Sequence, residues 1–133
     1  PNLNMLGIRE PGIYGSATYQ DLLDYIRSEA DTLGVTVTFY QSNHEGDLVD
    51  AIQAAYGKQD GIVINPGAYT HTSVALLDAV KAVGIPTVEV HVSDPDSREE
   101  FRHVSYIRAA CVGTIRGHGL PGYLEALHLL CQR

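Results

Sequence analysis

Residues 61–92, GIVINPGAYTHTSVALLDAVKAVGIPTVEVHV, decide the fold that we expect for this chain. Gly61 to Ile64 form a short apolar strand that ends at an Asn-Pro-Gly turn. Thr87 to Val92 form the next strand, and the helix between them is expected from about Thr72 to Val83, with Gly84 as its stop signal. A strand, a helix and a strand in this order are typical of parallel α/β architecture.

The same alternation continues on both sides of this unit. Thr18 and Asp21 have the spacing of a capping box, and the helix that they begin is expected to end at Gly34. The stretch from Val35 to Tyr40 alternates apolar and polar residues, which predicts a strand. The other expected elements are a helix around residues 48–55, a last strand over Ala109–Ile115 and a helix over about Pro121–Cys131. We therefore predict one α/β domain over residues 1–133, with its functional site at the carboxyl edge of a parallel sheet.

The composition excludes several function classes. Apolar residues make up 44% of the chain and charged residues 19%, which argues against disorder. The formal net charge of -7 argues against nucleic acid and anionic membrane surfaces as partners. No apolar run approaches the roughly 18–20 residues of a membrane-spanning helix, and no secretory leader is visible. Because Cys111 and Cys131 lie far apart in the sequence, we expect no disulfide framework, no zinc site and a cytoplasmic setting.

Candidate functional residues gather where the predicted strands end. Residues 65–73 lead from one strand to a helix N-terminus, whose N–H groups attract anions such as a carboxylate. Glu89 and His91 are two apart, so they share one face of the next strand while the valines between and beside them take the other. A polar pair on a buried strand is costly unless it is hydrogen-bonded. The pair is therefore either a satisfied structural pair or part of a site.

Three further stretches leave alternatives open. The glycine-punctuated residues 6–15 are typical of a lid, in which Arg9 beside Tyr14 would favour the phenolate and make tyrosine a usable base. The alternative is a surface loop with an exposed tyrosine. The charge run 98–102 is compatible with a solvated face as well as a site. The G-x-G-x-x-G pattern over residues 117–122 indicates tight strand-to-helix packing, because no ribose-binding acid follows it.

Together these motifs closely resemble type II 3-dehydroquinate dehydratase, also called type II dehydroquinase. The resemblance implies a flavodoxin-like three-layer sandwich around a central parallel sheet, and assembly as a dodecamer of trimers. It also implies dehydration of 3-dehydroquinate to 3-dehydroshikimate by anti elimination through an enolate, without a metal or an organic cofactor, in the shikimate pathway or in quinate breakdown. The matching stretches, which follow the family's order and spacing over nearly the whole chain, are residues 1–4, 9–11, 14–15, 41–46, 64–76, 89–93, 98–102, 105–106, 117, 119 and 122–123.

The resemblance assigns catalytic roles to five residues. Tyr14 matches the base that takes a proton from the carbon next to the ketone, and Arg9 matches the lid arginine that keeps this tyrosine ionised. Asn65 matches the residue that holds a water against the enolate. His91 matches the general acid that protonates the leaving hydroxyl, with Glu89 as its orienting partner.

The remaining matches imply substrate binding. The substrate carboxylate is expected to meet Ser93 and the backbone N–H groups of Val92 and Ser93, while His71 and Arg102 grip ring hydroxyls. Further expected contacts are Asn2 near the catalytic centre, Gly67 in the loop after the strand, and Asp78, which reaches the site of a neighbouring subunit.

The chain also departs from the family pattern. The family's first strand should precede Pro1, and it is not among these residues. Asp94 stands where we expect asparagine, which places a negative charge beside the carboxylate-binding turn, and Arg116 and His118 replace smaller or apolar residues. The alternatives to an active enzyme are a flavodoxin-like module that binds phosphate or nucleotide without turnover, and an inactive subunit kept for assembly.

Overall fold

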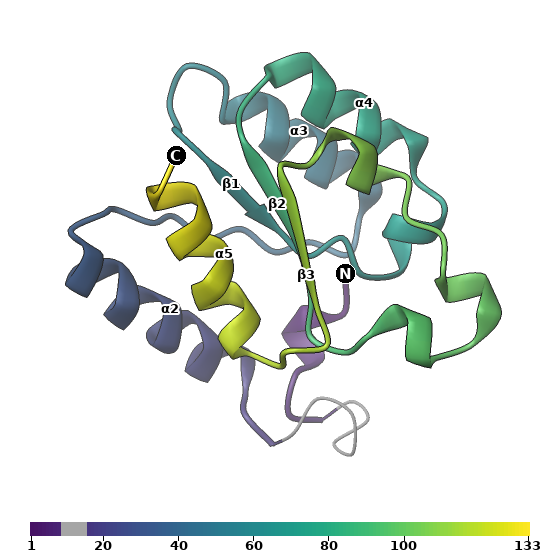
Figure 1. The fold of residues 1–133 in the computed structure, drawn as a ribbon, viewed down its shortest axis with the longest axis horizontal. Helices are drawn as coiled ribbons and strands as arrows, with labels where there is room; N and C mark the ends of the chain where they lie inside the picture. Colours follow the sequence, from purple (N-terminus) through teal and green to yellow (C-terminus); the bar gives the residue numbers. More distant parts are fainter. Residues whose placement is uncertain (9–15) are drawn as a thin grey trace.

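The computed structural model describes residues 1–8 and 16–133 and places a three-stranded parallel sheet at its centre (Figure 1). The strands are β1 (Ile62–Ile64), β2 (Thr87–His91) and β3 (Gly113–Arg116), in the spatial order β1-β2-β3. In the parallel register Val63 pairs with Val88, and Glu89 pairs with Thr114. The predicted parallel sheet is therefore confirmed among the described residues.

Helices cover both faces of the sheet (Figure 1). One layer holds α2 (Tyr19–Leu33) and α5 (Pro121–Cys131), and the other holds α3 (Glu45–Ala54) and α4 (Val74–Val83). Each layer has its own apolar core. The first joins Leu22 and Ala126 to the valines of β2, and the second joins Ile52 and Leu76 to β1. This arrangement is the expected three-layer α/β sandwich. None of the described helices is long and apolar enough to cross a membrane.

The ends of α2 follow from its sequence. The amide of Asp21 donates to Thr18 Oγ1 at 3.1 Å, and the amide of Thr18 donates to Asp21 Oδ2 at 3.0 Å. This reciprocal pair is the predicted capping box, which satisfies two amides that the helix itself leaves without partners. Gly34 ends the helix at a φ of 72°, a left-handed conformation that glycine adopts without steric cost.

The carboxyl end of β2 is surrounded by short 3-10 helices instead of one long loop. They are η1 (Leu3–Met5), η2 (Gly67–His71), η3 (Pro95–Ser97), η4 (Glu100–Arg102) and η5 (Ile107–Ala110). The last strand was expected over Ala109–Ile115 but begins only at Gly113, because Ile107 is drawn into the core beside α4 and the following residues turn as η5. The residues before β3 therefore lie against the polar face of β2.

The predicted strand over Val35–Tyr40 is wrong: this segment has no strand structure. A strand needs a neighbour to complete its hydrogen-bond ladder, and no described strand lies beside these residues. A groove of about 850 Å³ separates them from β1 instead, with Pro1 and Leu3 at its border. Its apolar lining includes Leu22, Ile26, Val35, Val37, Phe39, Val63, Leu127 and Leu130.

An apolar extended segment of about five residues fused before Pro1 should fill this groove and pair with the outer edge of β1. Each buried Val or Ile stabilises the folded state by roughly 1.5–3 kcal/mol. The melting temperature, measured by circular dichroism, should therefore rise by about 5 °C or more. A Gly-Ser extension of the same length is the matched control, and equal melting temperatures for the two extensions would contradict the expectation.

Candidate active site

A cleft of about 70 Å³ opens at the carboxyl end of β2. The segments that form it are the N-terminal residues, the loop after β1, the end of β2 and the residues around η3 and η4. Among its described lining residues none is acidic, although the whole chain carries a net charge of -7. The polar and charged lining side chains are Asn2, Asn65, His71, His91, Ser93, Arg98 and Arg102. A cleft that gathers cationic and amide groups in an acidic chain is suited to an anion.

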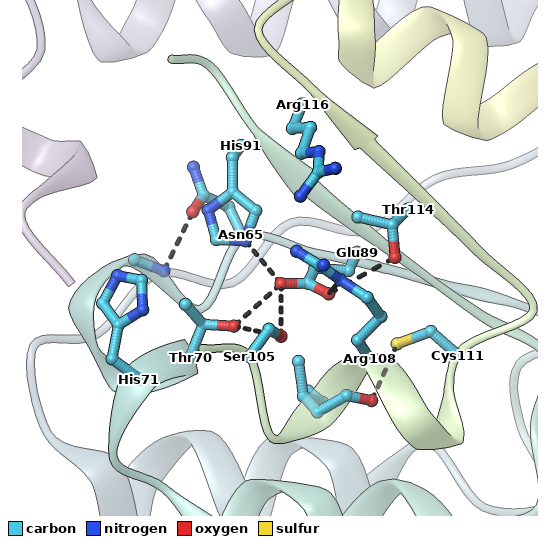
Figure 2. Close-up of polar contacts among 12 residues, drawn as sticks. Asn65, Thr70, His71, Glu89, His91, Ser105, Arg108, Cys111, Thr114 and Arg116 are labelled. Carbon is cyan, nitrogen blue, oxygen red and sulfur yellow. Dashed lines mark hydrogen bonds and ion pairs between the residues drawn. The ribbon is translucent and has the colours of Figure 1, made fainter. Parts of the chain in front are cut away.

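Glu89 and His91 form the buried polar centre of the site (Figure 2). The Glu89 side chain has no exposed surface, and His91 is 7% exposed. His91 Nε2 lies 2.5 Å from Glu89 Oε2, so this ring nitrogen is occupied and Nδ1 is the one that can face a ligand. The prediction that the two side chains share one face of β2 is confirmed, since the neighbouring valines pack in the core on the other face.

Three hydroxyl groups and an arginine surround the Glu89 carboxylate. Oε2 accepts hydrogen bonds from Thr70 Oγ1 at 2.8 Å and Ser105 Oγ at 2.9 Å, and Oε1 accepts one from Thr114 Oγ1 at 3.4 Å. Arg108 Nε lies 3.7 Å from Oε1. Burial alone raises the pKa of Glu89, but the hydrogen bond and charge of His91 and the two hydroxyls on Oε2 outweigh it and lower the pKa to about 2. Glu89 is therefore a carboxylate at neutral pH.

Asn65 is held from both ends of its amide. Nδ2 donates to the hydroxyl oxygen of Tyr123 at 2.7 Å, and Oδ1 accepts the amide of Gly67 at 2.9 Å. The second Nδ2 hydrogen remains for a ligand in the cleft. Tyr123 comes from α5, so one side chain of the opposite layer orients a residue of the site.

His71 and Arg102 border the cleft with restrained orientations. The His71 Nδ1 atom lies 2.6 Å from the carbonyl oxygen of Val104. Because a carbonyl only accepts, Nδ1 carries the proton and Nε2 is the ring nitrogen left for other partners. Arg102 Nε donates to Glu99 Oε2 at 2.6 Å, which leaves its terminal nitrogens for an anion or a hydroxyl.

The N-terminal segment closes one side of the cleft. The amide of Asn2 donates to Asn43 Oδ1 at 2.8 Å, and Asn2 itself has a φ of 64°. Gly67 also has a positive φ, 56°, and a Cβ placed there would lie 3.1 Å from Pro1 Cγ. Glycine at this position thus allows the N-terminal segment to approach the loop after β1.

The structure brings most, but not all, of the predicted site residues together. Val92 and Ser93 line the cleft as expected. Asp78 lies exposed on α4 and is not among the residues that line the cleft. Arg9 and Tyr14 lie outside the described residues.

Two departures from the family pattern face one another. Arg116 Nε lies 4.0 Å from Asp94 Oδ1, so the negative charge beside the predicted carboxylate-binding turn has a cationic neighbour. His118 instead lies on the surface, where its Nδ1 contacts Glu125 Oε2 at 2.8 Å. Among residues 1–8 and 16–133, no three metal-ligating side chains converge on one point.

Sequence analysis assigned no role to Thr70, Ser105, Arg108 and Tyr123. Thr70, Ser105 and Tyr123 lie in stretches that match the family, but nothing in the sequence indicates their contacts, because their partners are 16 to 58 positions away. Their spatial position shows which residues of the site they contact.

Comparison with known proteins identifies the relatives of this fold and site. The family described as Dehydroquinase class II matches residues 1–131. A 3-dehydroquinate dehydratase of Caldicellulosiruptor bescii is 57% identical over 131 residues, which cover 98% of this chain and 90% of the relative. Another from Corynebacterium glutamicum is 58% identical over 130 residues, with the same coverage. The crystal structure of a type II dehydroquinase from Butyrivibrio crossotus superposes with a TM-score of 0.96 at 51% identity, covering 98% of this chain and 91% of that one.

The lowered pKa of Glu89 predicts a pH-dependent contribution to stability. A carboxyl group whose pKa falls on folding, here from 4.5 to about 2, stabilises the folded state above its unfolded pKa. That contribution is lost as the pH falls through the folded value. The free energy of unfolding of the wild type, relative to that of Glu89→Gln, should fall by roughly 3 kcal/mol between about pH 5 and pH 2. Denaturant titrations at several pH values measure it, and parallel curves for the two proteins would refute it.

Proposed function

The chain belongs to the class II dehydroquinase family and is a 3-dehydroquinate dehydratase, and from this premise we propose which of its residues carry out the reaction. Loss of water from 3-dehydroquinate requires a base for the carbon next to the ketone, stabilisation of the enolate, and an acid for the leaving hydroxyl. The observation that carries the assignment is the buried Glu89–His91 pair, of which His91 lines a cleft without acidic lining residues among those described.

His91 is the general acid in this proposal. Glu89 occupies Nε2, so the protonated ring donates from Nδ1 to the leaving hydroxyl, which departs as water. The carboxylate stabilises the charged imidazolium before this transfer and holds the ring in one orientation. Its pKa of about 2 keeps Glu89 from competing for the proton.

Tyr14 is the base and Arg9 is its activator. The phenolate takes the proton from the carbon next to the ketone, and the electron pair moves to the ketone oxygen to give the enolate. A guanidinium beside the phenol favours its ionised form, because opposite charges lower the pKa of an acid. The enolate then reforms the ketone while the carbon–oxygen bond to the leaving hydroxyl breaks.

Asn65 stabilises the enolate through a bound water. The contacts to Tyr123 and Gly67 hold its amide in place and leave one Nδ2 hydrogen for that water. A donor fixed before the reaction needs no reorganisation when negative charge develops on the substrate oxygen.

The substrate carboxylate binds at Ser93 and the backbone N–H groups of Val92 and Ser93. His71 and Arg102, which also line the cleft, contact ring hydroxyls, and Asn2 and Gly67 close its N-terminal side. The 4.0 Å approach of Arg116 to Asp94 supports retention of carboxylate binding, because the guanidinium offsets the added negative charge.

We further propose assembly as a dodecamer of trimers, in which Asp78 reaches the site of a neighbouring subunit. Its exposed place on α4 and the exposed apolar side chains Val74, Phe101, Val104 and Tyr106 support such contacts. Sedimentation velocity tests the assembly, and a monomer at micromolar concentration would exclude it. We also place the enzyme in the cytoplasm, since Cys111 and Cys131 are free thiols that suit a reducing compartment; cell fractionation tests this location.

The direct test of the activity follows the conjugated enone product. Mixing the purified protein with 3-dehydroquinate should produce a rise in ultraviolet absorbance, and the rise should be equal with a chelator present. A rise that the chelator abolishes would require a metal and contradict the metal-free mechanism. A folded protein that produces no rise would contradict the activity itself.

Variants of the opening stretch test the base. Tyr14→Phe and Arg9→Ala should each lower kcat by roughly a hundredfold or more, as the loss of a base or its activator does. Steady-state kinetics with 3-dehydroquinate measures the effect, and Tyr25→Phe, on the surface of α2, serves as the control. Near-normal turnover in Tyr14→Phe would remove this tyrosine from the role of base.

A further inference from the structure

Two hydroxyl groups that the mechanism above does not use contact the same Glu89 oxygen that lies against His91. Thr70 Oγ1, Ser105 Oγ and Glu89 Oε2 form a triangle with sides of 2.8, 2.9 and 2.7 Å, the last between the two hydroxyl oxygens (Figure 2). Thr70 is 1% exposed and Glu89 is not exposed, so solvent does not replace these contacts. The triangle lies on the side of Glu89 that supports His91.

Counting protons shows what the triangle does to the carboxylate. Each hydroxyl has one proton, so the two hydroxyls supply two protons for three short contacts. At most one of these protons lies between the two hydroxyl oxygens, so at least one hydroxyl must donate to Oε2. Together with His91 Nε2, Oε2 therefore receives at least two hydrogen bonds, which an ionised oxygen accepts well.

The nearest cation does not replace these hydrogen bonds. Arg108 Nε is buried, makes no hydrogen bond among the described residues, and lies 3.7 Å from the other carboxylate oxygen. Thr114 also approaches Oε1, at 3.4 Å. The thiol of Cys111 adds no charge, because burial and then the charge of Glu89 raise its pKa to about 12. The charged and titratable groups facing Glu89 are thus His91 on β2, Arg108 on η5 and the neutral thiol that follows it.

A backbone hydrogen bond holds the two hydroxyl groups close to each other. Thr70 belongs to η2, and Ser105 lies 35 positions later, before η5. The amide of Tyr106 donates to the carbonyl oxygen of Thr70 at 2.9 Å, which ties the two segments together next to the triangle. The position of the hydroxyls is therefore built into the fold and does not depend on a bound ligand.

We propose that Thr70 and Ser105 are positioning residues, which hold Glu89 Oε2 against His91 Nε2 and so keep Nδ1 of His91 directed to the substrate. The proposal rests on the assignment of His91 as the general acid. Without the hydroxyls, the carboxylate can rotate toward Arg108 and Thr114, and neutral His91 can then carry its proton on either nitrogen. A ring with its proton on the wrong nitrogen or in the wrong orientation transfers protons slowly.

The test combines kinetics with the tautomer of His91. Thr70→Val and Ser105→Ala each remove one hydroxyl, and Thr70→Ser restores it. In the double variant kcat should fall by about tenfold or more while KM changes less than about twofold, because substrate contacts remain. Thr70→Ser should retain most of the wild-type kcat. Thr72→Val, an exposed change in the same loop, should leave kcat unchanged.

Nitrogen-15 spectra of the histidine rings, recorded without substrate on the neutral form of His91, give the second readout. The wild type should carry the proton on Nε2, and the double variant should show a mixture of tautomers. A folded double variant with unchanged kcat and an unchanged tautomer would overturn the proposal. If Thr70→Val does not fold, Ser105→Ala and Thr70→Ser are measured in the same way, and wild-type values in Ser105→Ala would refute it.

The two readouts separate this proposal from the function on which it rests. A wild type without dehydratase activity, whose tautomer nevertheless depends on the hydroxyls, would refute the function and leave the positioning intact. If the wild type is active, and removal of both hydroxyls changes neither kcat nor the tautomer of His91, the positioning proposal alone is refuted.

Discussion

The burial of the Glu89 carboxylate is the constraint on which the carboxyl end of the sheet depends. A charge without exposed surface costs several kcal/mol unless hydrogen bonds and a counter-charge replace its water. The structure provides His91 on the same strand, hydroxyls from η2 and from the segment before η5, and Arg108 nearby. Two separate segments, η2 and the stretch from Ser105 to Arg108, must therefore pack against β2 for the charge to be tolerated. In the proposed mechanism the same contacts prepare His91 for proton transfer, so stability and catalysis would depend on one set of interactions.

The sheet places this charge where a substrate can reach its partner. Along β2 the valines face the core below α2 and α5, and the polar residues face the other side. Because the strand ends at His91, the imidazole lies at the edge of the sheet. Glu89 lies two residues earlier on the same face of the strand and is therefore deeper in the protein. The cleft at that edge collects arginine and histidine from other segments, which matches the negative charge of a carboxylate substrate.

Residues 35–40, beyond β1, show that a strand-like pattern needs a paired strand beside it. Residues 35–40 have an alternating pattern suited to a strand, yet they face a groove of about 850 Å³ and form no ladder. Strand structure is a property of a pair, so a correct local pattern does not produce it alone. The late start of β3 has a different cause, because burial of Ile107 in the core outweighs the local preference for a strand.

Periodicity and end signals in the sequence determined the helices, because caps and glycine stops act within a few residues. The Thr18–Asp21 capping box, the αL glycines after α2 and α4, and the bounds of α5 all followed from local patterns. The pairing of Glu89 with His91 was also local, since residues two apart on a strand share a face. The family motifs identified the reaction, although Arg9 and Tyr14 lie outside the described residues. The triangle around Glu89, the restraint of Asn65 by Tyr123 and the approach of Arg116 to Asp94 were decided only by the tertiary structure, because these partners are distant in sequence and meet only when separate segments pack together.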